Sequence, residues 1–166
     1  MNPFWAYFWP ACGLGLLAGV VAGLAAWRRR RDRVIRLAAG TAASIVLAAL
    51  WHGPLGGADR FTASVRREIH AMLVDYEMTQ VQADLAHAPL TRRVLLSGPA
   101  DDFQRSELAR MMSELRGVES SSWSKQGGGM PLIAEGAAVA VLGFLLGLLL
   151  AYLVELRRRY NAQWNW

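Results

Sequence analysis

The residues of this chain that could perform chemistry are few, and one stretch brings a serine close to two acidic residues in sequence. In VLLSGPADD, residues 94–102, Ser97 stands before a glycine and two aspartates follow, as they would beside a serine nucleophile. Such a nucleophile needs an adjacent base, usually a histidine that a third group orients. His52, His70 and His87 show neither that arrangement with Ser97 nor the spacing of metal ligands. We therefore expect no enzymatic activity, no metal site and no cofactor.

The same stretch is better explained as the junction of a strand and a helix. A strand over 92–98 is predicted to end at Gly98 and Pro99, because proline cannot donate to a sheet. Asp101, with Gln104 three residues later, has the pattern of a capping box. In this interpretation Ser97 ends a strand and the aspartates begin a helix.

Apolar periodicity predicts the elements around this junction. A helix over 62–77 has apolar residues three or four positions apart: Val65, Ile69, Met72 and Tyr76. The helix after Asp101 has a second such set: Leu108, Met111, Met112 and Leu115. Gly117 is placed as its C-cap, strands are predicted at 81–85 and 118–123, and the glycine-containing segment 52–60 is predicted to be a linker. The predicted order is α-β-β-α-β.

The chain as a whole is too apolar for an ordinary soluble domain. Hydrophobic residues make up 54% of the 166 residues, and long apolar stretches cover about 4–27, 34–51 and 136–154. We predict a membrane protein with three transmembrane α-helices and a small α+β extramembrane domain. Its parts are a transmembrane hairpin at 1–54, the domain with glycine-rich tethers at 55–130, and the third span with its tail at 131–166.

The net positive charge of the chain is concentrated beside the spans. Arginines follow the first and third spans: Arg28, Arg29, Arg30, Arg31, Arg33, Arg157, Arg158 and Arg159. Positive charge favours the cytoplasmic side, which predicts a periplasmic N-terminus, a cytoplasmic C-terminus and a periplasmic domain in a bacterial inner membrane. Because the domain itself is nearly neutral, nucleic acid is excluded as a partner. Glu135 begins the third span at its outer end, where we expect its carboxylate to extend toward water.

Two further patterns, one of small residues and one of tryptophans, indicate how the spans contact other helices or the membrane interfaces. Small residues recur four positions apart within each span: Gly15, Gly19 and Gly23, then Gly40 and Ser44, then Gly143 and Gly147. Such residues let helix backbones approach closely, either within this chain or against another membrane subunit. Tryptophans stand near the span ends: Trp5, Trp9, Trp27, Trp51, Trp164 and Trp166. They are expected to anchor the spans at the membrane interfaces or to insert into a partner.

The segment VLLSGPADDFQRSELARMMSELRGVESSSW, residues 94–123, resembles the BON domain of bacterial envelope proteins. Gly98, Gly117 and Val118 fall where that family's pattern places them, and the resemblance covers 62–123. The chain departs from the pattern at the first β-β turn, HAPL, and in its short, serine-rich last strand. The resemblance implies a non-catalytic periplasmic module that contacts phospholipid, envelope or partner proteins.

These expectations favour an accessory, scaffolding or assembly subunit of a larger membrane complex, whose partners are other integral membrane proteins. The alternative is a freestanding envelope protein whose BON-like domain binds anionic phospholipid headgroups or cell-wall polymer. A small channel or carrier is favoured least, because the spans contain one acidic residue and no repeat.

Overall fold

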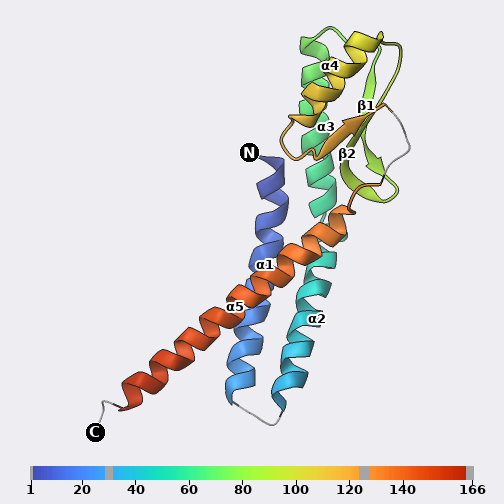
Figure 1. Cartoon of the computed structure of the whole chain (residues 1–166). Coiled ribbons are helices and arrows are strands. Elements are labelled where there is room, and N and C mark those ends of the chain that lie inside the picture. The colour runs from blue at the N-terminus through green and yellow to red at the C-terminus, as the bar shows by residue number, and fades with distance from the viewer. Residues whose placement is uncertain (1, 29–31, 124–127, 164–166) are drawn as a thin grey trace. The chain divides into compact units, whose positions relative to one another are not determined.

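The computed structural model describes residues 2–28, 32–123 and 128–163, with only the backbone of Arg28 and Gln163. In this part of the chain the elements are α1 (Pro3–Arg28), α2 (Arg33–His52), α3 (Gly57–Asp75), β1 (Gln82–His87), β2 (Leu90–Ser97), α4 (Asp102–Ser113), β3 (Ser120–Ser122) and α5 (Leu132–Gln163) (Figure 1). They form two compact units. Unit 1 comprises 1–7 and 56–135, and unit 2 comprises 8–55 and 136–166.

Three of the described helices have the length and composition of membrane spans. Helices α1, α2 and α5 contain 26, 20 and 32 residues, and about 20 apolar residues cross a bilayer. This confirms the prediction of three long apolar helices. Helix α2 extends beyond the predicted span 34–51, because it begins at Arg33 and ends at His52.

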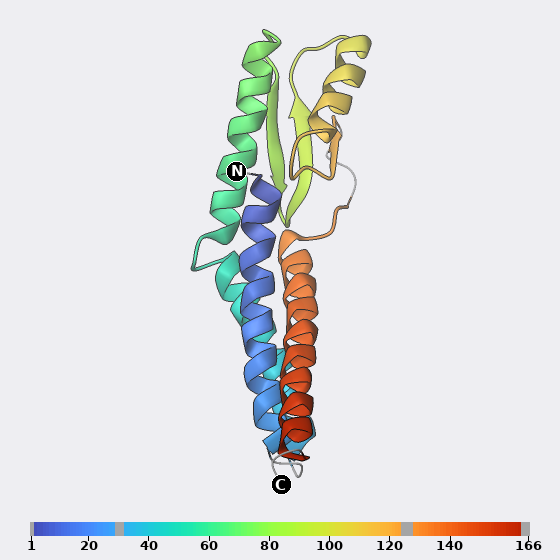
Figure 2. The ribbon, with the colours of Figure 1, turned by 90° about the vertical axis from the view of Figure 1, so that its left-hand side faces the viewer.

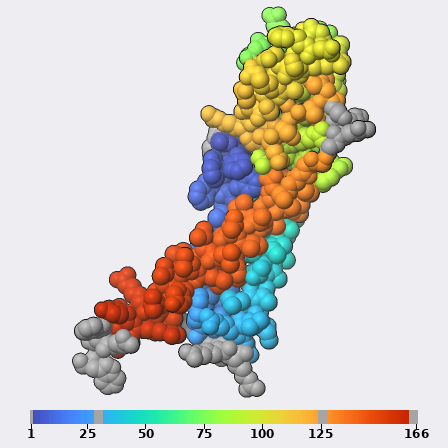
Figure 3. All heavy atoms as spheres, viewed as in Figure 1, coloured from blue at the N-terminus to red at the C-terminus, as the bar shows by residue number. Residues whose placement is uncertain are grey.

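Unit 1 contains a three-stranded sheet in the order β1-β2-β3. Strand β1 is antiparallel to β2, with Leu85 opposite Val94, and β3 is parallel to β2. Figures 1 and 2 show α3 and α4 on the same face of this sheet. In the space-filling view, α4, in yellow, forms much of the visible surface of unit 1 (Figure 3). The predicted order α-β-β-α-β is therefore confirmed for the described elements.

The core of unit 1 lies between the two helices and the sheet. Its buried side chains are Phe61, Val65, Ile69, Leu73, Leu85, Val94, Leu96, Leu108 and Met112. The predicted helix boundary was wrong, because α3 begins at Gly57, inside the predicted linker, and buries Ala58 and Phe61 in its first turns. The predicted apolar set was also wrong in part. Leu73 is buried in place of Met72, and Tyr76 lies beyond the helix with 55% of its surface exposed.

The capping box of α4 is confirmed. The Asp101 carboxylate accepts a hydrogen bond from the Gln104 backbone N–H at 2.7 Å, and the Asp101 N–H donates to the Gln104 side chain at 3.1 Å. The predicted C-cap was wrong, because α4 ends with Glu114 as its C-cap. Gly117 instead occupies the following turn with φ +92°, where its missing side chain leaves room for Phe61.

Candidate contact surface

The outward side of α3 presents a shallow groove. Phe61, Val65 and Ile69 point into the core, so the residues on the opposite side of the helix are left at the surface. The groove has a volume of about 700 Å³ and is lined by Arg60, Ala63, Ser64, Arg66, Arg67, His70 and Ala71. Alanines and a serine thus form its floor, while long basic side chains surround it. We call this set of residues the basic face of α3.

The side chains that line the basic face are predominantly basic. Three arginines and one histidine line the groove, and among the described residues no carboxylate does. The Arg67 guanidinium donates to the Ser64 hydroxyl at 3.2 Å, which holds it against the helix. Guanidinium groups bind carboxylates and phosphates through paired hydrogen bonds. The surface is therefore suited to an acidic partner surface or a phosphate-bearing ligand.

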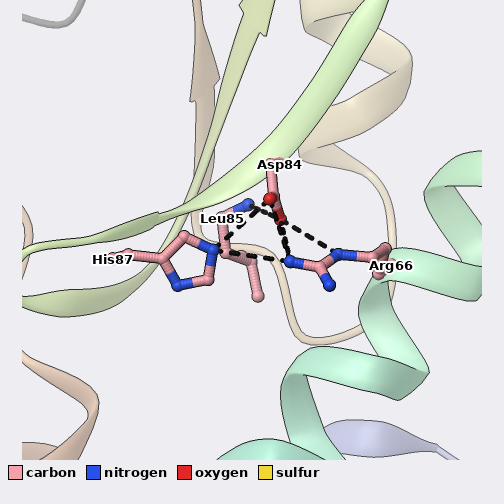
Figure 4. Close-up of polar contacts among 4 residues, drawn as sticks. All are labelled: Arg66, Asp84, Leu85 and His87. Carbon is pink, nitrogen blue, oxygen red and sulfur yellow. Dashed lines mark hydrogen bonds and ion pairs between the residues drawn. The ribbon is translucent and has the colours of Figure 1, made fainter.

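Arg66 is fixed at the edge of the groove by Asp84 of β1 (Figure 4). Its Nη2 donates to the two carboxylate oxygens of Asp84 at 3.1 and 2.9 Å, and its Nε to one of them at 3.3 Å. The Leu85 N–H donates to the same carboxylate at 2.8 Å, and His87 Nε2 lies 3.3 Å from it. Figure 4 shows these groups converging on one carboxylate.

The same contacts set the ionisation of Asp84. Partial burial acts to raise the pKa of its carboxyl, but the hydrogen bonds from Arg66, Leu85 and His87, together with the Arg66 charge, outweigh that effect. The pKa of Asp84 consequently lies below its usual value. Asp84 therefore stays ionised at neutral pH and keeps Arg66 in position.

Unit 1 also includes the first turns of α1 and α5, which are joined to the domain. Arg92 of β2 donates to the Glu135 carboxylate at 2.7 Å, and both side chains are largely buried. The Arg92 guanidinium also lies over the Phe4 ring. The Tyr7 ring packs against Phe61. We expected the Glu135 carboxylate to extend toward water. It is instead paired with Arg92 inside unit 1.

The small residues of the spans lie at contacts between helices of unit 2. A Cβ on Gly15 would overlap the Ala140 carbonyl, and one on Gly19 the Phe144 carbonyl. In α5, a Cβ on Gly143 would overlap the backbone of Cys12 in α1, and a Cβ on Gly147 would overlap the backbone of Leu16. Gly23 faces Ala151 and Trp27, Gly40 faces Ala22 and Phe144, and Ser44 is fully buried. These residues are therefore occupied by contacts within the chain.

The predicted anchor tryptophans and topology arginines that the structure describes lie in unit 2, except for Trp5, which lies in unit 1. Trp5 and Trp9 are about half and two-thirds exposed, Trp27 packs against Tyr152, and Trp51 lies in the last turn of α2. Arg28 ends α1, Arg33 begins α2, and three arginines lie in α5: Arg157, Arg158 and Arg159. The remaining predicted residues fall outside the described part of the chain: Arg29, Arg30, Arg31, Trp164 and Trp166.

The three residues that carry the BON resemblance have packing roles. Gly98 has φ +126°, and a Cβ there would lie 2.7 Å from the Gln80 carbonyl oxygen. Gly117 accommodates Phe61, as described above, and Val118 is buried. These positions hold the turns that follow β2 and α4.

The basic face was missed in the sequence, although a signal was present. Arg60, Ala63, Ser64, Arg67, His70 and Ala71 recur three or four positions apart, opposite the apolar residues of the same helix. In the described residues, no group of three or more histidine, cysteine or acidic side chains could hold a metal ion. Comparisons of the chain with protein-family models, curated proteins and solved structures found no match.

Proposed function

We propose that this chain is a non-catalytic accessory or scaffolding subunit of a larger membrane protein complex, in which the basic face of α3 binds an acidic surface of a partner subunit. The observation that carries the proposal is the groove itself, with a floor of small residues and cationic walls. Small residues allow a partner backbone to approach closely, and the arginines select for acidic groups.

The attachment of the domain supports a scaffolding role. Arg92 and Glu135 join β2 to the start of α5, and the contact of Tyr7 with Phe61 joins α1 to α3. Two apolar helices therefore begin on the domain without an intervening linker. A domain that includes the first turns of two apolar helices is tethered beside the membrane, as a scaffolding subunit requires. In this proposal the membrane is a bacterial inner membrane and the domain is periplasmic.

The resemblance to BON domains agrees with this proposal. It implies a periplasmic module that acts by contact, and Gly98, Gly117 and Val118 are the residues that carry it. The glycine contacts within unit 2 shift the predicted partner interface from the spans to the domain. Helix surfaces that contact the rest of the chain are not available to a second membrane protein.

Site-specific photocrosslinking in native membranes tests the proposal. A photoreactive residue in place of Ala63, in the groove, is expected to crosslink to another polypeptide, and reversal of charge by Arg60→Glu with Arg67→Glu is expected to abolish the product. The matched control is the same residue in place of Ser106, which is exposed on α4. Crosslinks from Ala63 to lipid alone would favour the freestanding envelope protein instead. Equal protein crosslinking from both positions would contradict the proposed surface.

A further inference from the structure

A second pocket lies in unit 2, far in sequence from the basic face. It has a volume of about 420 Å³ and is lined by residues from the end of α1, the start of α2 and the later part of α5. The side chains that matter to its chemistry are Trp27, Arg33, Tyr152, Glu155, Leu156 and Arg159. We propose that this pocket binds the headgroup of one anionic phospholipid.

The pocket combines aromatic walls with two guanidinium groups. The Trp27 and Tyr152 rings pack 5.8 Å apart, and the Arg33 guanidinium lies 5.6 Å from the centre of the Trp27 ring. Arg159 donates from Nε to the Glu155 carboxylate at 3.0 Å. Among the described residues, the terminal nitrogens of Arg159 have no partner. Two guanidinium groups and one carboxylate leave an excess of positive charge, to which a phosphate can bind through paired hydrogen bonds.

The start of α2 adds to this preference for an anion. Arg33 is the first residue of α2, and the preceding Asp32 makes no side-chain hydrogen bond to the helix. The N-terminal N–H groups of a helix carry partial positive charge and favour phosphate groups. The start of α2 therefore favours the binding of an anion, as the two arginines do.

The position of the pocket along α5 matches the level of lipid headgroups. Tyr152 lies 17 residues after Glu135, or about 26 Å at 1.5 Å per residue. The hydrocarbon core of a bilayer is about 30 Å thick. If Glu135 lies at one interface, Tyr152 therefore lies close to the other, where aromatic rings are favoured.

The surroundings distinguish a lipid from a soluble anion. Large apolar side chains close in sequence to the pocket residues are exposed on α2 and α5: Val34, Ile35, Leu149, Leu153 and Leu156, of which Leu156 lines the pocket. In the proposal they provide a surface for the acyl chains of the lipid whose phosphate binds the arginines. A soluble phosphate would use the arginines alone, whereas a phospholipid would use both features. Basic pockets between membrane helices are known sites for such headgroups.

The experiment uses the full chain in nanodiscs that contain equal amounts of phosphatidylcholine and phosphatidylglycerol. Native mass spectrometry then counts the lipids that each protein retains. The wild type is expected to retain one phosphatidylglycerol with a preference of about tenfold over phosphatidylcholine. The variant Arg33→Gln with Arg159→Gln is expected to lose this preference. Arg158→Gln removes a neighbouring charge outside the pocket and is expected to keep it.

Two further measurements, on lysine variants and with added phosphate, distinguish a bound lipid from a soluble anion. Arg33→Lys with Arg159→Lys keeps the charge and is expected to retain part of the preference, which covers the case in which the glutamine variant does not fold. Inorganic phosphate, added in excess, is expected to leave the bound lipid in place. Displacement by phosphate, equal retention of both lipids, or an equal loss in Arg158→Gln would each overturn the proposal. None of these outcomes depends on the basic face of α3.

Discussion

In unit 1, large apolar side chains such as Phe61 and Leu108 fill the space between two helices and a sheet. In unit 2, by contrast, α1 and α5 approach so closely that Gly15 and Gly147 touch the facing backbone. The difference reflects the two solvents that we propose for them. In water, burial of large apolar groups stabilises a core, whereas in lipid such groups gain little from burial and close packing of small residues replaces it.

The largest effect is expected from the core of unit 1. Phe61→Ala should lower the free energy of unfolding of this unit by about 3–5 kcal/mol, because it leaves a cavity beside Val65 and Tyr7. Hydrogen exchange of the β2 amides in the full chain measures this change. Phe103→Ala, at a side chain that is 75% exposed, is the control and should change stability by less than about 0.5 kcal/mol. Equal effects would show that the core is misassigned.

A slightly smaller effect is expected from enlarging a glycine in unit 2. Gly15→Leu should destabilise the helix bundle by about 3 kcal/mol, at the upper end of overpacking effects, because its Cβ would overlap the backbone of Ala140. Thermal unfolding in detergent micelles, followed by circular dichroism, measures the loss. Gly13→Leu is the matched control, since nothing lies within 4 Å of a Cβ there. A stable Gly15→Leu would argue against close contact of α1 with α5.

The ion pair that joins α5 to the domain should have an intermediate effect. Glu135→Gln should lower the stability of unit 1 by about 1–2 kcal/mol, because Arg92 stays largely buried without a carboxylate partner. Urea unfolding, read from exchange of the β2 amides, measures it. Glu155→Gln removes a more exposed pair with Arg159 on the same helix and should cost less than about 0.5 kcal/mol. The assigned pair of Arg92 with Glu135 inside unit 1 would be contradicted if Glu135→Gln behaved like this control.

The capping box of α4 should contribute about 1 kcal/mol. Asp101→Ala removes the acceptor for the Gln104 N–H, and faster exchange of that amide is the direct measurement. Asp102→Ala, one residue later, removes an acid of the first turn without removing the cap and should cost a few tenths of a kcal/mol. Unchanged protection of the Gln104 amide in Asp101→Ala would contradict the assigned cap.

The smallest effect concerns pH. The folded pKa of Asp84 is lower than its unfolded value, so its contribution to stability is present at neutral pH and is lost as the pH falls through the folded pKa. Because the side chain is about half exposed, this contribution should stay below about 1 kcal/mol. Unfolding of the wild type and of Asp84→Asn from about pH 7 to about pH 3 measures it. A variant as sensitive to acid as the wild type would refute the assignment.

Local patterns in the sequence predicted the local features of the fold. Asp101 and Gln104 are three residues apart, so their capping box could be recognised without knowing the fold. The spacing of the glycines likewise indicated helix contacts. The burial of Leu73 in place of Met72 was missed, because both residues are apolar and spacings of three and four are equally compatible with a helix.

Features that join distant segments could not be predicted. Arg92 and Glu135 are 43 residues apart, and the contact of Trp27 with Tyr152 joins two different spans. No spacing rule relates such pairs, because the chain between them must fold first. The basic face of α3 was different, since its helical spacing was visible in the sequence. It was overlooked because the helix was assigned from its apolar side alone and begun too late to include Arg60.

The central proposal, a subunit that binds an acidic partner through α3, is tested most directly by the protein mass of the particle extracted from native membranes. After extraction in mild detergent, light scattering during size-exclusion chromatography gives this mass without the detergent. The account predicts a particle heavier than one chain, with a second polypeptide present, and a shift to one chain in the variant Arg60→Glu with Arg67→Glu. A wild-type particle that contains one chain and no second polypeptide would contradict it.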